Sequence, residues 1–211
     1  MLYAYNTTHD RILATPQAIG ICPSCNQSLI AKCGHINIWH WSHRTKEPLC
    51  NYQPETEWHM QWKQTALNCG NDIEVRIGNH ITDILNNNNN RLIELQNSSI
   101  NVGDIIDRCE VFKHYGFMVD WIFNRISKYE NEQLYFTRKE KYWTFKQKWQ
   151  KKLLRFLFND DLYPKYGRVW FDIGESHPLF LIRKLYSSGG GWGKFAARFS
   201  PIYKIRYVVV D

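Results

Sequence analysis

Three polar side chains lie on a predicted β-hairpin in the middle of the chain. Two short apolar runs, Ile81 to Leu85 and Leu92 to Leu95, flank five consecutive asparagines, the composition of two strands joined by a polar turn. Asp83 lies near the middle of the first strand, whereas Glu94 and Gln96 are two residues apart on the second and share a face. Burying two carboxylates on adjacent strands costs free energy through desolvation and repulsion, and a divalent cation removes both costs. Asp83 and Glu94 on the hairpin are therefore candidate ligands of a divalent cation.

The same spacing of acids has a second interpretation. Asp and Glu side chains are mostly exposed in proteins, so Asp83 and Glu94 would also fit two solvated acids on an edge hairpin. A pattern of one acid, ten residues, then Glu-x-Gln is short enough to occur by chance. The motifs on either side of the hairpin decide between the two interpretations.

Cysteine and histidine are concentrated between Cys22 and Cys50. Cys22 and Cys25 are separated by two residues, the spacing at which two thiolates bind one ion across a tight turn. The distal pair is either His43 with Cys50 or His40 with His43. We prefer the first pair, because a gap of two residues between histidines is shorter than usual. The predicted zinc ligands are therefore Cys22, Cys25, His43 and Cys50.

This zinc site is expected to be structural. Four protein ligands leave no coordination position for water, which excludes the open geometry of a catalytic zinc. Cys33 and His35 remain as spare donors, and His40 and Trp41 are expected to pack against the metal-binding turn. Free buried thiols and surface histidines are the alternative. Four of the six cysteines lie in this segment, which favours metal binding in a reducing compartment over a disulfide framework.

Residues 55–69 predict a helix that starts after a proline and ends before a glycine. Glu55, His59 and Lys63 follow one another at steps of four residues and share one helical face. Two turns separate Glu55 from Lys63, which is too far for a direct ion pair on a helix, so we expect the partner of Lys63 elsewhere, for example on a phosphate. For His59 the alternative is a structural role between helix and sheet.

Together these motifs resemble the competence protein CoiA-like family, which is placed with the PD-(D/E)XK nucleases. The resemblance runs from about residue 15 to residue 125 and implies a link to DNA processing during natural transformation. The motifs that carry it are, in chain order, Cys22-Pro23-Ser24-Cys25, His40-Trp41-Ser42-His43, Cys50, Glu55-Thr56 with His59 and Lys63, the residues Asp83, Glu94, Gln96, Ser98 and Ile100 of the hairpin region, then Arg108, Tyr115 and Val119 to Phe123.

The resemblance also implies roles for individual residues. Asp83 and Glu94 match the two acids of the PD-(D/E)XK pattern, and Gln96 stands where lysine is more usual. In such folds the helix before the hairpin often offers an acid to the metal, which would make Glu55 a third ligand. Gln96 cannot carry positive charge or accept a proton, so it can orient a water or a phosphate but cannot act as a base.

The predicted fold is α+β, with an αβββαβ order in the nuclease-like part. Ser98 and Ser99 lie close enough to the second helix to cap it, or to bind a phosphate at its N-terminus. Asp120, in the last strand, has no predicted role. Three segments are expected: an N-terminal hairpin and zinc-binding module at 1–53, a nuclease-like core at 54–125, and a basic helical segment with C-terminal strands at 126–211. After the first helix, the core elements are a strand at 72–77, the hairpin, a helix at 101–115 and a strand at 117–123.

The most basic part of the chain lies between residues 138 and 155, where eight Lys or Arg residues face one acid. A helix from about Thr144 would suit contact with a phosphate backbone. A solvated helix face is the alternative. The side chains that such a helix would turn outward are Lys148, Lys151, Lys152 and Arg155.

The C-terminal part also predicts β-structure. Apolar and aromatic runs at 168–173, 179–186 and 202–210 indicate strands that could form a small added sheet. The Ser- and Gly-rich run at 187–193 indicates a flexible loop between two of them.

Composition narrows the class of partner. The chain has 211 residues, a formal net charge of +7 and a pI of about 9.1, which favours an anionic partner such as DNA. No apolar run reaches the ~18 residues of a membrane-spanning helix, and no secretory signal pattern opens the chain, so we expect a cytoplasmic protein. Other DNA-processing or defence proteins are further expected partners.

The sequence thus predicts a magnesium- or manganese-dependent deoxyribonuclease acting in DNA uptake, recombination or defence. Two alternatives remain: a DNA-binding accessory that keeps the fold without catalysis, and a zinc-containing interaction module whose basic segment meets an acidic protein. The expected catalytic residues are Asp83, Glu94, Gln96, Glu55, His59 and Lys63. The expected DNA contacts are Arg108, Lys148, Lys151, Lys152 and Arg155.

Overall fold

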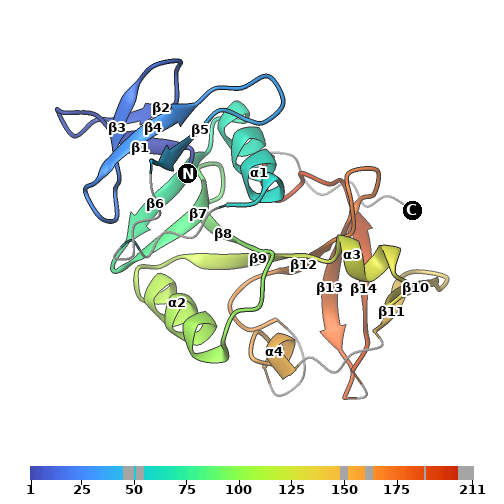
Figure 1. Cartoon of the computed structure of the whole chain (residues 1–211). Helices are drawn as coiled ribbons and strands as arrows, with labels where there is room; N and C mark the ends of the chain where they lie inside the picture. Colours follow the sequence, from blue (N-terminus) through green and yellow to red (C-terminus); the bar gives the residue numbers. More distant parts are fainter. Residues whose placement is uncertain (45–49, 51–54, 148–151, 160–163, 188, 204–211) are drawn as a thin grey trace. The chain divides into compact units, whose positions relative to one another are not determined.

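The computed structural model describes residues 1–44, 50, 55–147, 152–159, 164–187 and 189–203 (Figure 1). The chain forms two compact units, Met1–Thr65 and Ala66–Asp211, and each contains one β-sheet. The architecture is α+β and dominated by its sheets.

The first unit is built on a five-stranded antiparallel sheet. β1 pairs with β2, which confirms the predicted N-terminal hairpin. Trp41 is buried in one apolar cluster with Leu29 and Cys22, as expected for a side chain that packs behind the metal-binding turn. At Gly20 a Cβ atom would lie 2.5 Å from the Cβ of Ala4, so only glycine fits at this crossing. The strands are β1 (Tyr3–Tyr5), β2 (Arg11–Leu13), β3 (Ile19–Ile21), β4 (Ser28–Lys32) and β5 (His40–His43), in the spatial order β2-β1-β3-β4-β5.

The second unit is built on a nine-stranded mixed sheet. β8, β9 and β12 are parallel neighbours, and the remaining pairs are antiparallel. The strands are β6 (Asp72–Ile77), β7 (His80–Asn86), β8 (Arg91–Gln96), β9 (Met118–Asn124), β10 (Leu134–Arg138), β11 (Trp143–Gln147), β12 (Val169–Asp172), β13 (Leu179–Leu185) and β14 (Gly191–Ala196), in the order β10-β11-β14-β13-β12-β9-β8-β7-β6.

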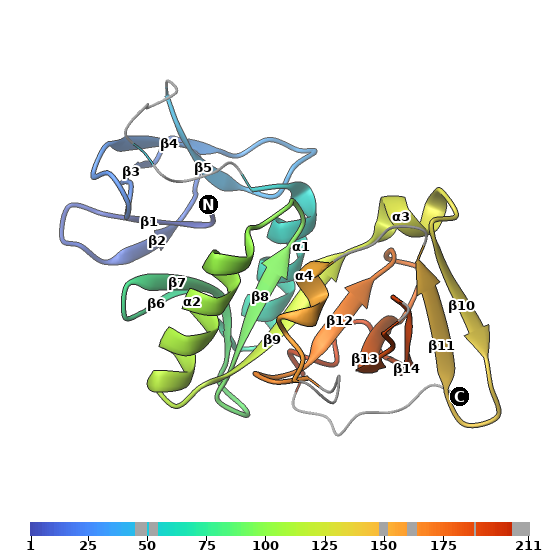
Figure 2. The ribbon, with the colours of Figure 1, turned by 90° about the horizontal axis from the view of Figure 1, so that it is seen from below.

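Helix α1 (Glu57–Asn68) confirms the helix predicted over 55–69, and helix α2 (Val102–His114) confirms the one predicted over 101–115. α2 packs on the sheet at β8 and β9 (Figure 2) and buries Ile105, Cys109 and Phe112 in the main apolar cluster. Its N-cap is Asn101, whose side-chain oxygen accepts a 2.8 Å hydrogen bond from the N–H of Asp104. Asn101 directly precedes the first helical turn, so the cap falls there and not at the earlier serines.

The helix predicted from Thr144 is wrong, because residues 143–147 form strand β11. In this segment polar and apolar residues alternate: Phe145 is buried in the core, whereas Lys146 is exposed. Partners on both sides, β10 and β14, then complete its hydrogen bonds. The only helix in the described part of this region is the short α4 (Lys152–Arg155). Helix α3 (Ile126–Glu130) lies earlier, between β9 and β10.

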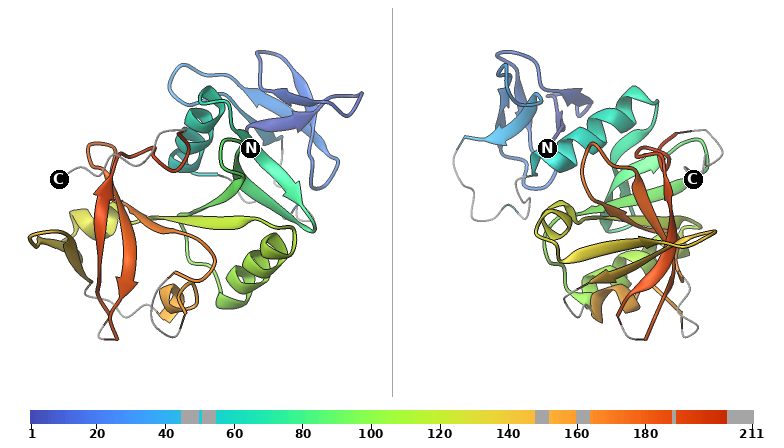
Figure 3. Two further views of the ribbon diagram at one scale, coloured as in Figure 1. Left: turned by 180° about the vertical axis from the view of Figure 1, so that it is seen from behind. Right: turned by 90° about the vertical axis from the view of Figure 1, so that its right-hand side faces the viewer.

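The C-terminal strands join the main sheet and do not form a small sheet of their own. β12 and β13 lie where strands were predicted, and β12 pairs in parallel with β9. Figure 3 shows β13 and β14, in orange and red, lying side by side. The loop predicted at 187–193 is shorter than expected, because Gly191 and Gly193 belong to β14. A Cβ atom at Gly193 would lie 2.0 Å from the carbonyl oxygen of Leu181, so the glycine permits the close pairing.

The last predicted strand, 202–210, falls almost entirely outside the described residues. Ile202 and Tyr203 belong to a turn. The carbonyl oxygens of Pro201 and Ile202 accept hydrogen bonds from the side chains of Asn86 and Asn71, which ties this segment to the β6–β7 hairpin of the second unit.

Candidate functional site

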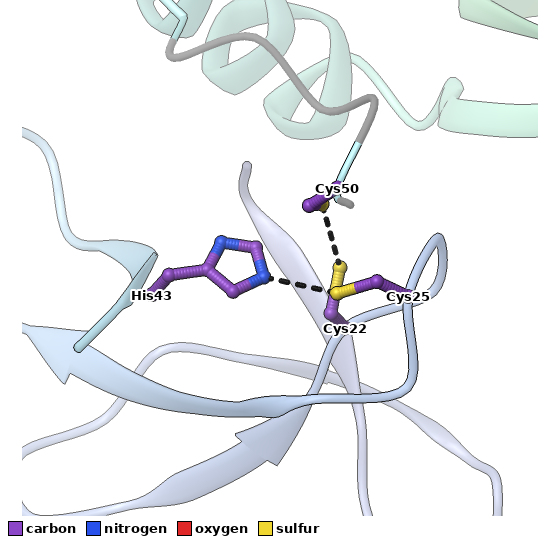
Figure 4. A group of neighbouring side chains, drawn as sticks. All are labelled: Cys22, Cys25, His43 and Cys50. Atoms are coloured by element: carbon purple, nitrogen blue, oxygen red, sulfur yellow. Dashed lines mark hydrogen bonds between the residues drawn. The ribbon is translucent and has the colours of Figure 1, made fainter. Parts of the chain in front are cut away.

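Four metal-binding side chains meet in the first unit (Figure 4). The ligand atoms of Cys22, Cys25, His43 and Cys50 all lie within 4.8 Å of one another. The Sγ atoms of Cys22 and Cys50 are 3.8 Å apart, and the Sγ of Cys25 lies 3.2 Å from Nε2 of His43. These are the ligands that the sequence favours over the pair of His40 and His43.

Local structure holds the first two ligands in place. The chain turns sharply after β3, where the N–H of Asn26 donates to the carbonyl oxygen of Cys22 at 3.0 Å. The N–H of Ser24 points at the Sγ of Cys22 at 3.4 Å. His43 is the last residue of β5, and Nδ1 of His40 lies 2.8 Å from the carbonyl oxygen of Ile38.

The donor set suits zinc. Three thiolates and one imidazole are soft and borderline ligands, which zinc binds in tetrahedral geometry. Burial raises the pKa of Cys22 to about 11, so this thiol is neutral at pH 7 in the metal-free protein and would lose its proton on binding zinc. Four ligands from the protein close the coordination shell, so the role that fits the cluster is structural.

The two hairpin acids lie on adjacent strands of the second unit. The register of β7 and β8 pairs Ile84 with Ile93, so Asp83 and Glu94 are the next residues on the two strands. Oδ2 of Asp83 accepts a 2.8 Å hydrogen bond from the N–H of Leu95. This bond fixes the Asp83 carboxylate against the backbone of the strand that carries Glu94.

Glu94 is buried and already has a cationic partner. Its side chain is 6% exposed, and NH1 of Arg108, on α2, donates to its Oε2 at 3.0 Å. The same nitrogen donates to the carbonyl oxygen of Ile81 at 3.2 Å. Arg108, predicted as a DNA contact, therefore lies at the carboxylate pair, with 30% of its side chain exposed.

Gln96 is half-buried at the end of β8. Its Nε2 donates to the carbonyl oxygen of Ser98 at 2.7 Å. The amide group that stands in for the usual lysine is therefore engaged with the backbone that follows the strand.

The residues predicted on the first helix lie in the first unit. Lys63, only 2% exposed, forms an ion pair with Glu55, and the N-terminal amino group lies 3.8 Å from the other oxygen of the same carboxylate. The expectation that Glu55 is too far from Lys63 is wrong, because it assumed that both residues are helical. Glu55 precedes the first turn of α1, so its carboxylate can fold back to a buried ammonium that needs a counter-charge. Nδ1 of His59 lies 2.8 Å from the hydroxyl of Thr56.

Part of the predicted basic surface lies outside the described residues. Lys148 and Lys151 fall in that part of the chain, and of Lys152 only the backbone is described, in α4. Arg155 is exposed at the end of α4.

Sequence reasoning missed the charged cluster around Asp120 in the second unit. Asp120 is fully buried on β9 and forms ion pairs with Arg91 and Arg168. The sequence did offer one indication, a single acid inside the apolar strand Val119 to Phe123. A buried aspartate requires cationic partners, so this acid predicts that such partners exist. Those partners come from distant parts of the sequence, so spacing alone could not identify them.

Comparisons with known families give the class first. Residues 76–162 match the family model of the nuclease-like domain of competence protein CoiA. Residues 7–53 match the family model of the N-terminal domain of the same protein. The two matches together cover more than half of the chain. The chain therefore belongs to the CoiA-like competence protein family, and its nuclease-like domain indicates a nuclease-related role in competence. No curated protein and no solved structure matches the chain. Within the described residues, no helix has the length and apolar character to cross a membrane.

Proposed function

We propose that the second unit is a metal-dependent DNA nuclease of the PD-(D/E)XK type, with Asp83 and Glu94 as the ligands of Mg²⁺ or Mn²⁺. The observation that carries the proposal is the carboxylate pair itself. Asp83 and Glu94 occupy neighbouring positions on β7 and β8, and the Asp83 carboxylate is hydrogen-bonded to the residue after Glu94. Carboxylate oxygens in this arrangement suit a hard divalent cation.

The order of elements supports the same proposal. From α1 through β6, β7, β8 and α2 to β9, the chain follows the predicted αβββαβ order, with antiparallel pairs up to β8 and a parallel pair after α2. The carboxylates lie on the two central strands of this run.

Each nearby residue then has a defined task. A bound divalent cation would polarise the scissile phosphate and lower the pKa of a bound water. Asp83 and Glu94 would hold that cation, and Arg108, beside Glu94, would donate to a phosphate oxygen as negative charge develops there. Gln96 can orient a water or a phosphate through its amide, but it cannot take a proton.

The proposal does not depend on the first helix. Glu55 is engaged by Lys63, so its use as a third metal ligand would require that ion pair to open. A contribution of Lys63 or His59 to cleavage is a separate hypothesis. Unchanged cleavage by a Lys63→Ala variant that folds would exclude Lys63.

The direct test is cleavage of linear single- and double-stranded DNA by the full chain with Mg²⁺ or Mn²⁺. Asp83→Asn and Glu94→Gln should abolish cleavage while keeping zinc content and fold. Glu140→Gln, the same charge change at an exposed turn, should cut like wild type. Equal cleavage by all four proteins would show that the activity lies elsewhere or comes from a contaminant.

A DNA-binding accessory without catalysis is the second candidate. It is favoured by the Glu94 and Arg108 pair, because a guanidinium already neutralises the carboxylate that would bind metal. In that case DNA binding would be insensitive to Mg²⁺ and to Asp83→Ala, and no cleavage would be seen with either metal.

A further inference from the structure

A second charged site lies on the opposite face of the main sheet from Glu94. Successive residues of a strand point to alternate faces, so Arg91 and Glu94, three residues apart on β8, point to opposite sides. On the Arg91 side is a cavity of about 480 Å³. Among the residues that the structure describes, its lining includes Arg91, Arg168, Arg183 and Trp192 and no acidic residue.

A buried carboxylate positions two of these arginines. Asp120 is fully buried behind the cavity, where its Oδ1 accepts from Nε of Arg91 at 3.2 Å and its Oδ2 from Nε of Arg168 at 2.7 Å. The backbone N–H of Arg168 also donates to Oδ1 at 2.9 Å. The side chains of both arginines are 18% exposed, so each guanidinium is fixed in place but still reaches solvent.

The backbone around Arg168 is built for this close approach. At Gly167 a Cβ atom would lie 1.9 Å from the carbonyl oxygen of Val119, so only glycine allows the segment to pass over β9. The carbonyl oxygen of Arg168 then accepts a 2.8 Å hydrogen bond from the N–H of Trp121. These contacts make the arginine cluster a rigid part of the sheet.

Among the described residues, the cavity lining carries more positive than negative charge. Arg183, exposed on β13, adds a third guanidinium, whereas Asp120 is the carboxylate that pairs with the other two. Burial lowers the pKa of Arg168, Asp120 raises it, and the neighbouring Arg91 lowers it again. The two fixed guanidiniums therefore repel each other, and an anion between them would relieve that repulsion.

An aromatic surface adjoins the arginines. Trp192, on β14, lines the cavity, and the ring of Tyr142 lies 5.5 Å from its ring between centroids. Tyr142 is 39% exposed. Aromatic faces beside fixed guanidiniums are the combination by which proteins stack bases and hold the phosphates of unpaired strands.

We propose that this cavity binds single-stranded nucleic acid, with a phosphate at Arg91, Arg168 and Arg183 and a base on Trp192. The site extends the proposed nuclease function by giving it a strand-binding surface away from the carboxylate pair. A small anion such as inorganic phosphate would meet the arginines but gain nothing from Trp192. A strand of abasic residues therefore separates the two contributions.

The test is the affinity of the full chain for a fluorescent oligothymidylate, measured by anisotropy without added Mg²⁺ or Mn²⁺, so that the proposed nuclease does not cut and the zinc stays bound. Arg183→Gln should weaken binding about fivefold near 0.1 M salt and lower the salt slope by about 0.7. Trp192→Leu should weaken binding about tenfold for the oligothymidylate but leave binding to an abasic strand unchanged. Lys113→Gln removes an exposed charge on α2, on the other face of the sheet, and is the matched control.

Equal affinities of Arg183→Gln and Lys113→Gln would overturn the proposed strand site, and so would wild-type protein that does not bind the oligonucleotide. Equal losses on thymidylate and abasic strands with Trp192→Leu would show that no base stacks there. Cleavage assays of the same proteins keep the two proposals distinct. Loss of binding in Arg183→Gln with no cleavage by wild type would support the strand site and reject the nuclease. Cleavage by wild type with unchanged binding in Arg183→Gln would support the nuclease and reject the strand site.

Discussion

The carboxylate of Asp83 is joined to the backbone of Leu95 by a 2.8 Å hydrogen bond that crosses from β7 to β8. Leu95 follows Glu94, so this single bond sets the position of one hairpin acid relative to the other. It also means that the acceptor oxygen and the charge of Asp83 can be separated by mutation. An asparagine keeps an oxygen that can accept from Leu95 but loses the negative charge.

Asp83→Asn is therefore expected to fold like wild type and to lose cleavage. The loss should be about a hundredfold or more, because a metal ion stabilises the transition state by several kcal/mol. Steady-state cleavage of linear DNA with Mg²⁺ or Mn²⁺ measures it, with urea unfolding as the check on stability. If the variant has the wild-type midpoint of urea unfolding and still cuts at the wild-type rate, Asp83 is not a ligand of the catalytic metal.

Arg108→Gln tests whether a metal ion and the Arg108 guanidinium bind the same carboxylate, that of Glu94. Removing the arginine leaves Glu94 buried without it, which should lower the free energy of unfolding by about 1–2 kcal/mol, since the arginine is partly exposed. Because Mg²⁺ would replace the lost positive charge, adding it should raise the Tm of this variant more than that of wild type. Differential scanning fluorimetry over a magnesium titration measures both effects. Arg138→Gln, at an exposed position on β10, is the control. Equal magnesium shifts in all three proteins would show that the guanidinium of Arg108 and a cation do not compete for Glu94.

Metal removal should act on the first unit. One zinc per chain is expected by elemental analysis, and a chelator or Cys50→Ser should release it.

Burial holds the pKa of Cys22 at about 11 without metal, above the ordinary thiol value, so zinc must displace a proton at any pH below that value. Zinc affinity should consequently fall as the pH is lowered, by up to about tenfold per pH unit for each proton released. Competition with a chromogenic chelator between pH 6 and 8 would reveal this slope, and a flat profile would argue against thiolate ligands.

Asp120→Asn should be among the most destabilising changes in the second unit. Removing the charge leaves Arg91 and Arg168 facing each other without their shared carboxylate, at a cost of about 3 kcal/mol. Asp107→Asn, on the exposed side of α2, removes the charge that faces His80 and should cost less than about 0.5 kcal/mol. Urea unfolding of the two variants beside wild type gives the comparison. A loss below 1 kcal/mol in Asp120→Asn would mean that the cluster is not a major source of stability.

Local patterns predicted the hairpin, both longer helices and the strands that follow them. The run of asparagines between Leu85 and Leu92 defines a turn by composition alone, and the alternation of side chains then fixes which face carries Asp83 and Glu94. The cysteine spacing likewise predicted the ligand cluster, because two thiols two residues apart need only one turn to meet.

Errors arose where partners are distant in sequence or where a residue lies just outside an element. The segment 143–147 begins a lysine-rich stretch typical of a helix surface, but strands β10 and β14 provide partners on both sides and make it a strand. Glu55 meets Lys63 because it lies before α1, a difference of two residues that periodicity cannot resolve. Asp120 needed Arg168, 48 residues away, to explain it.

The parallel pairing of β9 with β12 limits how the protein can be shortened. The N–H of Trp121 donates to the carbonyl oxygen of Arg168, and the N–H of Arg125 donates to that of Asp172. A fragment that stops after β9 would leave these groups along an open strand edge and would uncover the aromatic residues that pack behind it. Such edges recruit strands from other molecules, so the fragment should aggregate on expression. Recombinant pieces of the nuclease-like half need to extend at least through β14 to stay monodisperse.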